Sequence, residues 1–205
     1  MTIVAERHVP QTSASDLCED PLSAFNRHWD KIADGNTYLV IEPRDSSQFC
    51  QAAQMLLELP PFSRIAEGRV PVALSQIRDL PEAIFRDIEG LATRFAQLAT
   101  SDHVRIRLEQ ITTNSCRKLH ADYTDLRLIT TYAGPGTQIP TDNNPQAQIL
   151  LDVPTGHVGV FKGRRYGNGH APCYHRSPSA GDLGIKRLVL VIDTKMFASD
   201  DECRS

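Results

Sequence analysis

Residues 104–109 of the chain read Val-Arg-Ile-Arg-Leu-Glu, with an apolar residue at every second position. Side chains two positions apart point to the same face of a strand, so this alternation predicts a half-buried β-strand. The preceding stretch has a different period, because apolar residues between Pro81 and Ala99 recur mostly at steps of three and four. That spacing predicts an amphipathic helix. The change of period near Ser101 therefore divides the chain into a helical part and a β part.

Five further stretches after residue 109 are predicted to form strands. They are rich in apolar, β-branched and aromatic residues, and links rich in glycine, proline and asparagine separate them. Helices followed by many short strands favour an α+β fold that ends in an antiparallel barrel or jelly roll. The predicted strands are Leu126–Tyr132, Ala147–Val153, His157–Lys162, Cys173–Arg176 and Arg187–Asp193.

Two shorter helices are expected before Pro81. Asp20-Pro21 has the residue types of a helix start, and apolar residues then repeat at helical spacing until Gly35. An extended piece over residues 37–43 precedes a second helix, which Pro60-Pro61 ends. The sequence thus predicts three helices before the strands.

The chain has 205 residues, 40% hydrophobic and 23% charged, which is typical of a globular protein with a sizeable core. Residues 1–19 are polar and without period, so we expect a flexible arm there. A single domain is expected over residues 20–205. Within it, residues 20–100 form the mainly helical part and residues 101–195 form the β-barrel core.

Net charge, apolar runs and cysteine spacing argue against several classes of partner and location. A formal net charge of -3 provides no global positive field for nucleic acid. The N-terminal sequence lacks the apolar segment of a signal peptide, and no apolar run is long enough to span a bilayer. The five cysteines contain no Cys-x-x-Cys pair. These features favour a cytoplasmic protein with reduced thiols and no membrane partner, and they do not indicate an oligomeric state.

Three residues form a candidate metal site. In a strand, His120 and Asp122 would direct an imidazole and a carboxylate to the same side. His175, on a later predicted strand, can supply a third ligand if the barrel brings it opposite them. Two histidines and one carboxylate occupy one face of an octahedron and leave positions open, as in non-haem Fe(II) oxygenases.

The order of these residues resembles the signature of the 2-oxoglutarate- and Fe(II)-dependent dioxygenase superfamily: His-x-Asp, a histidine about fifty residues later, and Arg187 about a dozen residues after that. The resemblance implies Fe(II) and 2-oxoglutarate as cofactors, with Arg187 binding the far carboxylate of 2-oxoglutarate. It also implies a double-stranded β-helix, that is, a jelly-roll or cupin-like barrel, on which the N-terminal helices pack. Because Asp122 supplies the carboxylate that halogenating relatives lack, a hydroxylase is expected.

Residues 116–193 also resemble the bacterial family catalogued as domain of unknown function 1826. The matching stretches are CRKLHADYTDLRLITTYAGPGTQIP, HVGVFKG and YHRSPSAGDLGIKRLVLVID. The resemblance implies that the metal-ligand candidates, together with Arg127 and Arg187, belong to the motif of the family. Members often occur in zinc-homeostasis gene neighbourhoods, which favours zinc as the alternative ion.

Three residues of the predicted strand 126–132 are further candidates for cofactor binding. Arg127 can bind a carboxylate of substrate or cosubstrate, or it can pair with Asp193, because a cation inside a barrel is costly unless paired. Thr130 and Tyr132 can contact the cosubstrate, or they can pack in the core. Arg187 has a simpler alternative as a sheet-edge arginine.

Two other functions remain open from the sequence. The chain can be a non-catalytic zinc-binding accessory protein of metal homeostasis that uses the same three residues, and Cys116 or Cys173 as well. It can also be a metal-free cupin-like protein that binds a small ligand. The principal expectation is an oxygenase that acts on a small molecule or an amino-acid-like compound.

Overall fold

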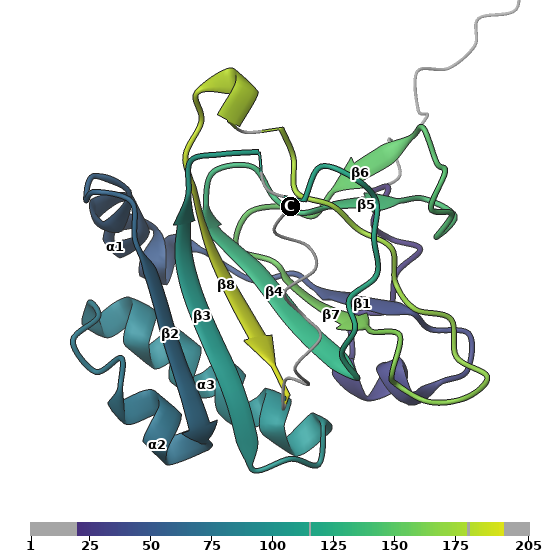
Figure 1. Cartoon of the computed structure of the whole chain (residues 1–205), viewed down its shortest axis with the longest axis horizontal. Helices are drawn as coiled ribbons and strands as arrows, with labels where there is room; N and C mark the ends of the chain where they lie inside the picture. The colour runs from purple at the N-terminus through teal and green to yellow at the C-terminus, as the bar shows by residue number, and fades with distance from the viewer. Residues whose placement is uncertain (1–19, 115, 180, 195–205) are drawn as a thin grey trace, which may run out of the picture.

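The architecture is taken from a computed structural model, which describes residues 20–114, 116–179 and 181–194. The predicted arm over residues 1–19 lies outside these ranges. A six-stranded antiparallel sheet forms the centre of the molecule, with the helices against one face and a two-stranded sheet and loops on the other side (Figure 1). The α+β class with a large antiparallel sheet agrees with the sequence prediction.

The large sheet has the strand order β1-β7-β4-β8-β3-β2, and every neighbouring pair in it is antiparallel. The smaller sheet pairs β5 with β6, and isolated bridges join His120 to His175 and Gln138 to Arg176. After β3 the chain therefore passes back and forth between two β layers. The strands are β1 Leu39–Glu42, β2 Ser63–Arg69, β3 His103–Ile111, β4 Leu126–Ala133, β5 Gln138–Pro140, β6 Leu150–Asp152, β7 Val158–Lys162 and β8 Arg187–Asp193.

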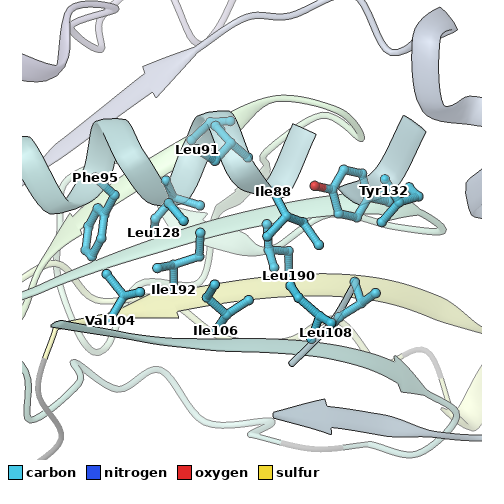
Figure 2. Close-up of a cluster of buried hydrophobic side chains, with 14 of the residues drawn as sticks. Ile88, Leu91, Phe95, Val104, Ile106, Leu108, Leu128, Tyr132, Leu190 and Ile192 are labelled. Atoms are coloured by element: carbon cyan, nitrogen blue, oxygen red, sulfur yellow. The ribbon is translucent and has the colours of Figure 1, made fainter. Parts of the chain in front are cut away.

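The second and third predicted helices are confirmed. They are α1, Ser47–Leu57, and α3, Glu82–Leu98, and a short helix α2, Val70–Ser75, lies between them. The apolar stripe of α3, which includes Ile88, Leu91 and Phe95, packs on the large sheet (Figure 2). None of the helices among the described residues has the length and apolar character needed to cross a membrane.

The predicted helix between residues 20 and 35 is wrong. Only the 3₁₀ helix η1, Trp29–Ala33, forms there, after two turns. Asn26 makes a bridge to Val40 of β1, and its carbonyl accepts a hydrogen bond from the Ile41 backbone at 2.9 Å. Because this backbone is used to pair with a strand, it cannot continue an α-helix.

Other predicted boundaries also differ from the structure. The strand β2 and the helix α2 were not expected. The residues of β2, an edge strand, are mostly exposed and lack a clear apolar alternation. The predicted strand 147–153 is limited to β6, and the predicted strand 173–176 contributes only bridges. Strand β8 has the predicted bounds.

Two apolar clusters lie on opposite faces of the large sheet. The cluster between sheet and helices includes Leu128 of β4, and the cluster between the two β layers includes the next residue, Ile129. Along β4, even-numbered positions from 126 to 132 therefore face the helices and odd-numbered positions face the second layer. This alternation decides which polar side chains of β4 can reach a site between the layers.

Candidate metal centre

The structure brings together the three residues that the sequence singled out. One ligand atom from each of His120, Asp122 and His175 lies within 4.8 Å of the others. The Nε2 atom of His175 is 3.3 Å from Oδ2 of Asp122, and Nε2 of His120 is 3.7 Å from Oδ1 of the same carboxylate. Asp122 and His175 are buried. The arrangement matches the ligand set expected from the sequence.

Backbone pairing between distant segments places the two histidines opposite each other. The His120 N–H donates to the His175 carbonyl at 3.0 Å, and the His175 N–H donates to the His120 carbonyl at 2.9 Å. The two ring centroids are 4.7 Å apart, and the ring of Phe161 lies 4.9 Å from that of His175. The bridge therefore fixes the spacing of two candidate ligands, and His-Ala-Asp places the third beside them.

Each imidazole has its Nδ1 atom near a backbone carbonyl oxygen. Nδ1 of His120 lies 3.0 Å from the Lys118 carbonyl, and Nδ1 of His175 lies 3.4 Å from the Cys173 carbonyl. A carbonyl can only accept a hydrogen bond, so Nδ1 of each ring is the donor. In the neutral ring this leaves a lone pair on Nε2, the atom that points into the cluster. Such carbonyl contacts are typical of histidines that bind metals.

Burial also favours the metal-binding form of His175. It lowers the pKa of this imidazole to about 4, against the opposing influence of Asp122. The ring is therefore neutral at pH 7 and able to donate its lone pair to a cation.

Asp122 has one carboxylate oxygen that accepts a hydrogen bond from Arg127 and one that does not accept any. Its Oδ2 atom is buried and has no hydrogen-bond partner among the described residues. Burial opposes ionisation, but nearby positive charge, including that of Arg127, outweighs it and lowers the pKa of this carboxyl. A buried, ionised oxygen without a donor is costly unless a cation satisfies it. The donor set therefore fits a divalent metal ion.

Arg127 fixes the carboxylate of Asp122 from the large sheet. Its guanidinium donates to Asp122 and forms two hydrogen bonds with Asp193, at 2.6 and 3.0 Å. The alternative that Arg127 pairs with Asp193 is confirmed. Because two carboxylates already compensate its charge, Arg127 is a positioning residue for Asp122.

Arg187 lies at the start of β8, with 1% of its surface exposed. Its Nε donates to the Pro135 carbonyl at 2.6 Å, and Nη2 lies 3.4 Å from Oγ1 of Thr131. It forms no ion pair with a carboxylate of the described residues. Burial lowers its pKa to about 10, with Asp152 opposing the shift, so the group stays protonated at pH 7. The interpretation as an exposed sheet-edge arginine is wrong, since β8 is an inner strand.

The prediction that Thr130 and Tyr132 contact a cosubstrate needs correction. Oγ1 of Thr130 accepts a hydrogen bond from Arg44, and the Tyr132 hydroxyl donates to Asp87 of α3 at 2.6 Å. Both side chains therefore face the helices, on the opposite side of β4 from the cluster. The hydroxyl that sequence reasoning missed is that of Thr131, which shares the face of Arg127.

Tyr132 consequently has a structural role that can be measured. Its hydroxyl is buried and donates to a carboxylate, a type of bond that contributes about 1.5–3 kcal/mol. We expect Tyr132→Phe to lower the free energy of unfolding in urea by about that amount. Tyr123→Phe, at an exposed ring, is the matched control and should change it little. Equal effects of the two substitutions would contradict this role.

The two candidate cysteine ligands do not join the cluster. Among the described residues, the converging ligand atoms come from His120, Asp122 and His175 alone. Cys173 is buried in the apolar cluster between the layers, and burial raises the pKa of its thiol well above the usual value. A protonated thiol is a poor metal ligand, and the geometry does not support a mixed Cys/His zinc site.

Comparison with known proteins gave one family match. The family model described as "Protein of unknown function (DUF1826)" matches residues 73–193 of the chain. The comparison with curated proteins returned no match.

Several solved structures share the fold. A rice dioxygenase for auxin oxidation is 12% identical with a TM-score of 0.55, over 84% of this chain and 79% of the rice protein. The Arabidopsis thaliana enzyme AtDAO1 in complex with 2-oxoglutarate is 9% identical with a TM-score of 0.51, over 84% and 88% of the two chains. JOX2 in complex with 2OG, Fe and JA is 8% identical with a TM-score of 0.54, over 83% and 71%. At such identities the likeness establishes the fold alone.

Proposed function

This chain belongs to the DUF1826 family of proteins of unknown function, and from that premise we propose that it is an Fe(II)- and 2-oxoglutarate-dependent oxygenase. The proposal depends above all on one observation, the convergence of two Nε2 atoms with the Oδ2 atom of Asp122, which has no hydrogen-bond partner among the described residues. Two imidazoles and one carboxylate leave coordination positions open, which an oxygenase requires. The ligands in this proposal are His120, Asp122 and His175.

The strand arrangement is consistent with such an enzyme. We propose that the two β layers form a double-stranded β-helix within a single domain, with the metal bound between them. Solved structures of similar fold include the dioxygenase AtDAO1 in complex with 2-oxoglutarate and JOX2 in complex with 2OG, Fe and JA. In this proposal the helices brace the outer face of the large sheet.

Iron in such a centre supplies the redox chemistry that couples oxidation of 2-oxoglutarate to oxidation of a second substrate. With that ion bound, one oxygen atom of O₂ would enter succinate, which is released with CO₂, and the other would enter the hydroxyl group of the product. Around that reaction, backbone carbonyls orient His120 and His175, and Arg127 orients Asp122. A carboxylate at residue 122 favours hydroxylation as the outcome.

Arg187 is the proposed site for the far carboxylate of 2-oxoglutarate. A fully buried guanidinium that forms no ion pair with a carboxylate of the described residues favours an anionic ligand, because an uncompensated buried charge is costly. The planar guanidinium can bind a carboxylate through two parallel hydrogen bonds. Thr131 lies beside it and can donate a third.

Anaerobic titration of the metal-free protein with Fe(II) and 2-oxoglutarate tests the proposal. We expect a weak visible charge-transfer band that needs both components, and release of succinate when air is admitted. Tight zinc binding with no affinity for 2-oxoglutarate would instead favour the zinc-binding accessory protein. Turnover outranks metal content after purification, because zinc binds most nitrogen and oxygen sites more tightly than Fe(II).

A further inference from the structure

Two arginines of β3 lie on the sheet face that carries the candidate centre. Val104, Ile106 and Leu108 of β3 are buried in the cluster beneath the helices, so Arg105 and Arg107 point to the opposite face. The register confirms this, because Arg105 lies opposite Asp193, and Asp193 lies opposite Arg127. Arg105, Asp193 and Arg127 therefore form one row across the face that lies under Asp122.

The guanidinium of Arg107 has an unused hydrogen-bond donor among the described residues. Its side chain is 24% exposed, and its Nε atom is buried without a hydrogen-bond partner among the described residues. The nearest carboxylate oxygen, on Glu109, is 3.8 Å from Nε, which is too long for a hydrogen bond. Arg127, two strands away, is by contrast held by two carboxylates.

The other charges on this face do not compensate Arg107 fully. Glu67 lies 3.8 Å from Arg105, and its side chain is 60% exposed. Asp122 and Asp193 are both engaged by Arg127. Glu109 is thus the one acidic residue in ion-pair contact with Arg107 among the described residues, and its own side chain is 33% exposed. An additional anion can displace this loose contact.

The position of Arg107 separates it from the proposed cosubstrate anchor. Arg107 pairs with Val191 of β8, whereas Arg187 pairs with Ile111, four residues further along β3. At about 3.3 Å per residue, this places the two arginines about 13 Å apart along the strands. Arg127 lies two strands away from Arg107 and is offset from it by two residues along the strands. Their Cα atoms are therefore about 12 Å apart. It is therefore close enough to the centre to bind a different small molecule there.

We propose that Arg107 binds an anionic group of the second substrate of the oxygenase, a small molecule with a carboxylate or a phosphate and an apolar part. The apolar part follows from Val191 and Ile129, which face the same side in the same row across the sheet. This inference rests on the proposed function. Arg107 supplies binding and orientation, and Arg105 adds positive charge beside it.

Four probes with the same six-carbon chain test the charge preference: hexanoate, hexyl phosphate, hexanol and hexylamine. Their binding to the full-length protein with Fe(II) and 2-oxoglutarate under anaerobic conditions is measured by ligand-observed NMR. We expect one or both anions to bind at least 10-fold more tightly than hexanol and hexylamine. A preference between hexanoate and hexyl phosphate identifies which anion the substrate carries.

Two substitutions should have opposite effects on anion binding. Arg107→Met should weaken it at least 10-fold, and Glu109→Gln should strengthen it about 3-fold because it removes the competing carboxylate. Arg86→Met, at an exposed arginine of α3, is the matched control and should leave binding unchanged. A merely structural role for Arg107 does not predict tighter binding in the Glu109 variant. Equal binding of all four probes, or unchanged binding in Arg107→Met, would overturn the inference.

The same samples separate this inference from the proposed function. Fe(II) and 2-oxoglutarate binding to the unmodified protein is recorded first. If neither binds, while hexanoate or hexyl phosphate still binds through Arg107, the proposed oxygenase is wrong and Arg107 is an anion site without a second-substrate role. If Fe(II) and 2-oxoglutarate both bind, but neither anion binds wild type more tightly than Arg107→Met, the inference about the substrate is wrong. The proposed oxygenase function is not contradicted by that result.

Discussion

His175→Ala should abolish the visible band that Fe(II) and 2-oxoglutarate are expected to give together, and should lower Fe(II) affinity by about 100-fold or more. Loss of a residue that merely supports a ligand typically costs 10–100-fold in affinity, so loss of a ligand should cost at least as much. His175 is the ligand supplied from the distant segment, and its ring is buried and neutral. Competition with a chelator of known affinity gives the Fe(II) dissociation constant, and the visible spectrum gives 2-oxoglutarate binding.

A matched control separates loss of a ligand from loss of an imidazole in general. His103 is half-exposed at the start of β3 and lies outside the cluster, so His103→Ala should leave the band unchanged. Removal of the buried His175 ring also leaves a cavity, so thermal unfolding is recorded for both variants. A folded His175→Ala protein that binds Fe(II) and 2-oxoglutarate as tightly as wild type would contradict the assignment of the centre.

The sequence was sufficient to predict the local half of this centre. His120 and Asp122 are two residues apart, and that spacing alone predicts that both side chains point the same way. The third ligand depends on backbone pairing between segments more than fifty residues apart, and only its order in the motif suggested it. Long-range pairing has no local signal, which is why the convergence required the structure.

The assignment of Thr130 and Tyr132 as cosubstrate contacts failed for a different reason. Both faces of β4 are buried, one under the helices and one between the β layers. Alternation therefore grouped Thr130 with Tyr132 correctly but did not reveal which face of β4 points to the candidate centre. Arg127 carried the missing signal, because a charged residue in a buried strand points to the face where it finds partners. Thr131, four residues after Arg127, shares that face.

Local pattern was most reliable where an element carries a strong apolar pattern, along one face in α3 and on both faces in β8. Helix α3 and strand β8 have clear apolar runs and formed close to their predicted bounds. The stretch from residue 20 to 35 had helical spacing, yet pairing of Asn26 with β1 prevailed over it. Residue spacing indicates which side chains are buried. Competition for backbone hydrogen bonds decides whether the segment that carries them forms a helix or pairs with a strand.

Arg187→Met should raise the dissociation constant of 2-oxoglutarate about 100-fold while Fe(II) affinity changes little. Two hydrogen bonds between a guanidinium and a carboxylate are lost, and a 100-fold change corresponds to about 2.8 kcal/mol. Arg187→Lys keeps the charge but not the planar pair of donors, so an intermediate loss is expected. Titration of the Fe(II)-loaded protein with 2-oxoglutarate measures all three proteins. An unchanged constant in Arg187→Met would exclude this residue as the anchor.

Stability measurements on the ligand-free protein distinguish a binding arginine from a structural one. Arg187 is buried without a carboxylate partner among the described residues, so an apolar side chain of similar length should leave the free energy of unfolding unchanged or increase it. Arg127→Met leaves Asp122 and Asp193 buried without their cation, and should cost about 3–5 kcal/mol. If the free energy of unfolding falls in Arg127→Met but not in Arg187→Met, Arg187 does not stabilise the fold. That result would support a role of Arg187 in binding a ligand. A loss of several kcal/mol in both variants would instead assign Arg187 to the structure of the barrel.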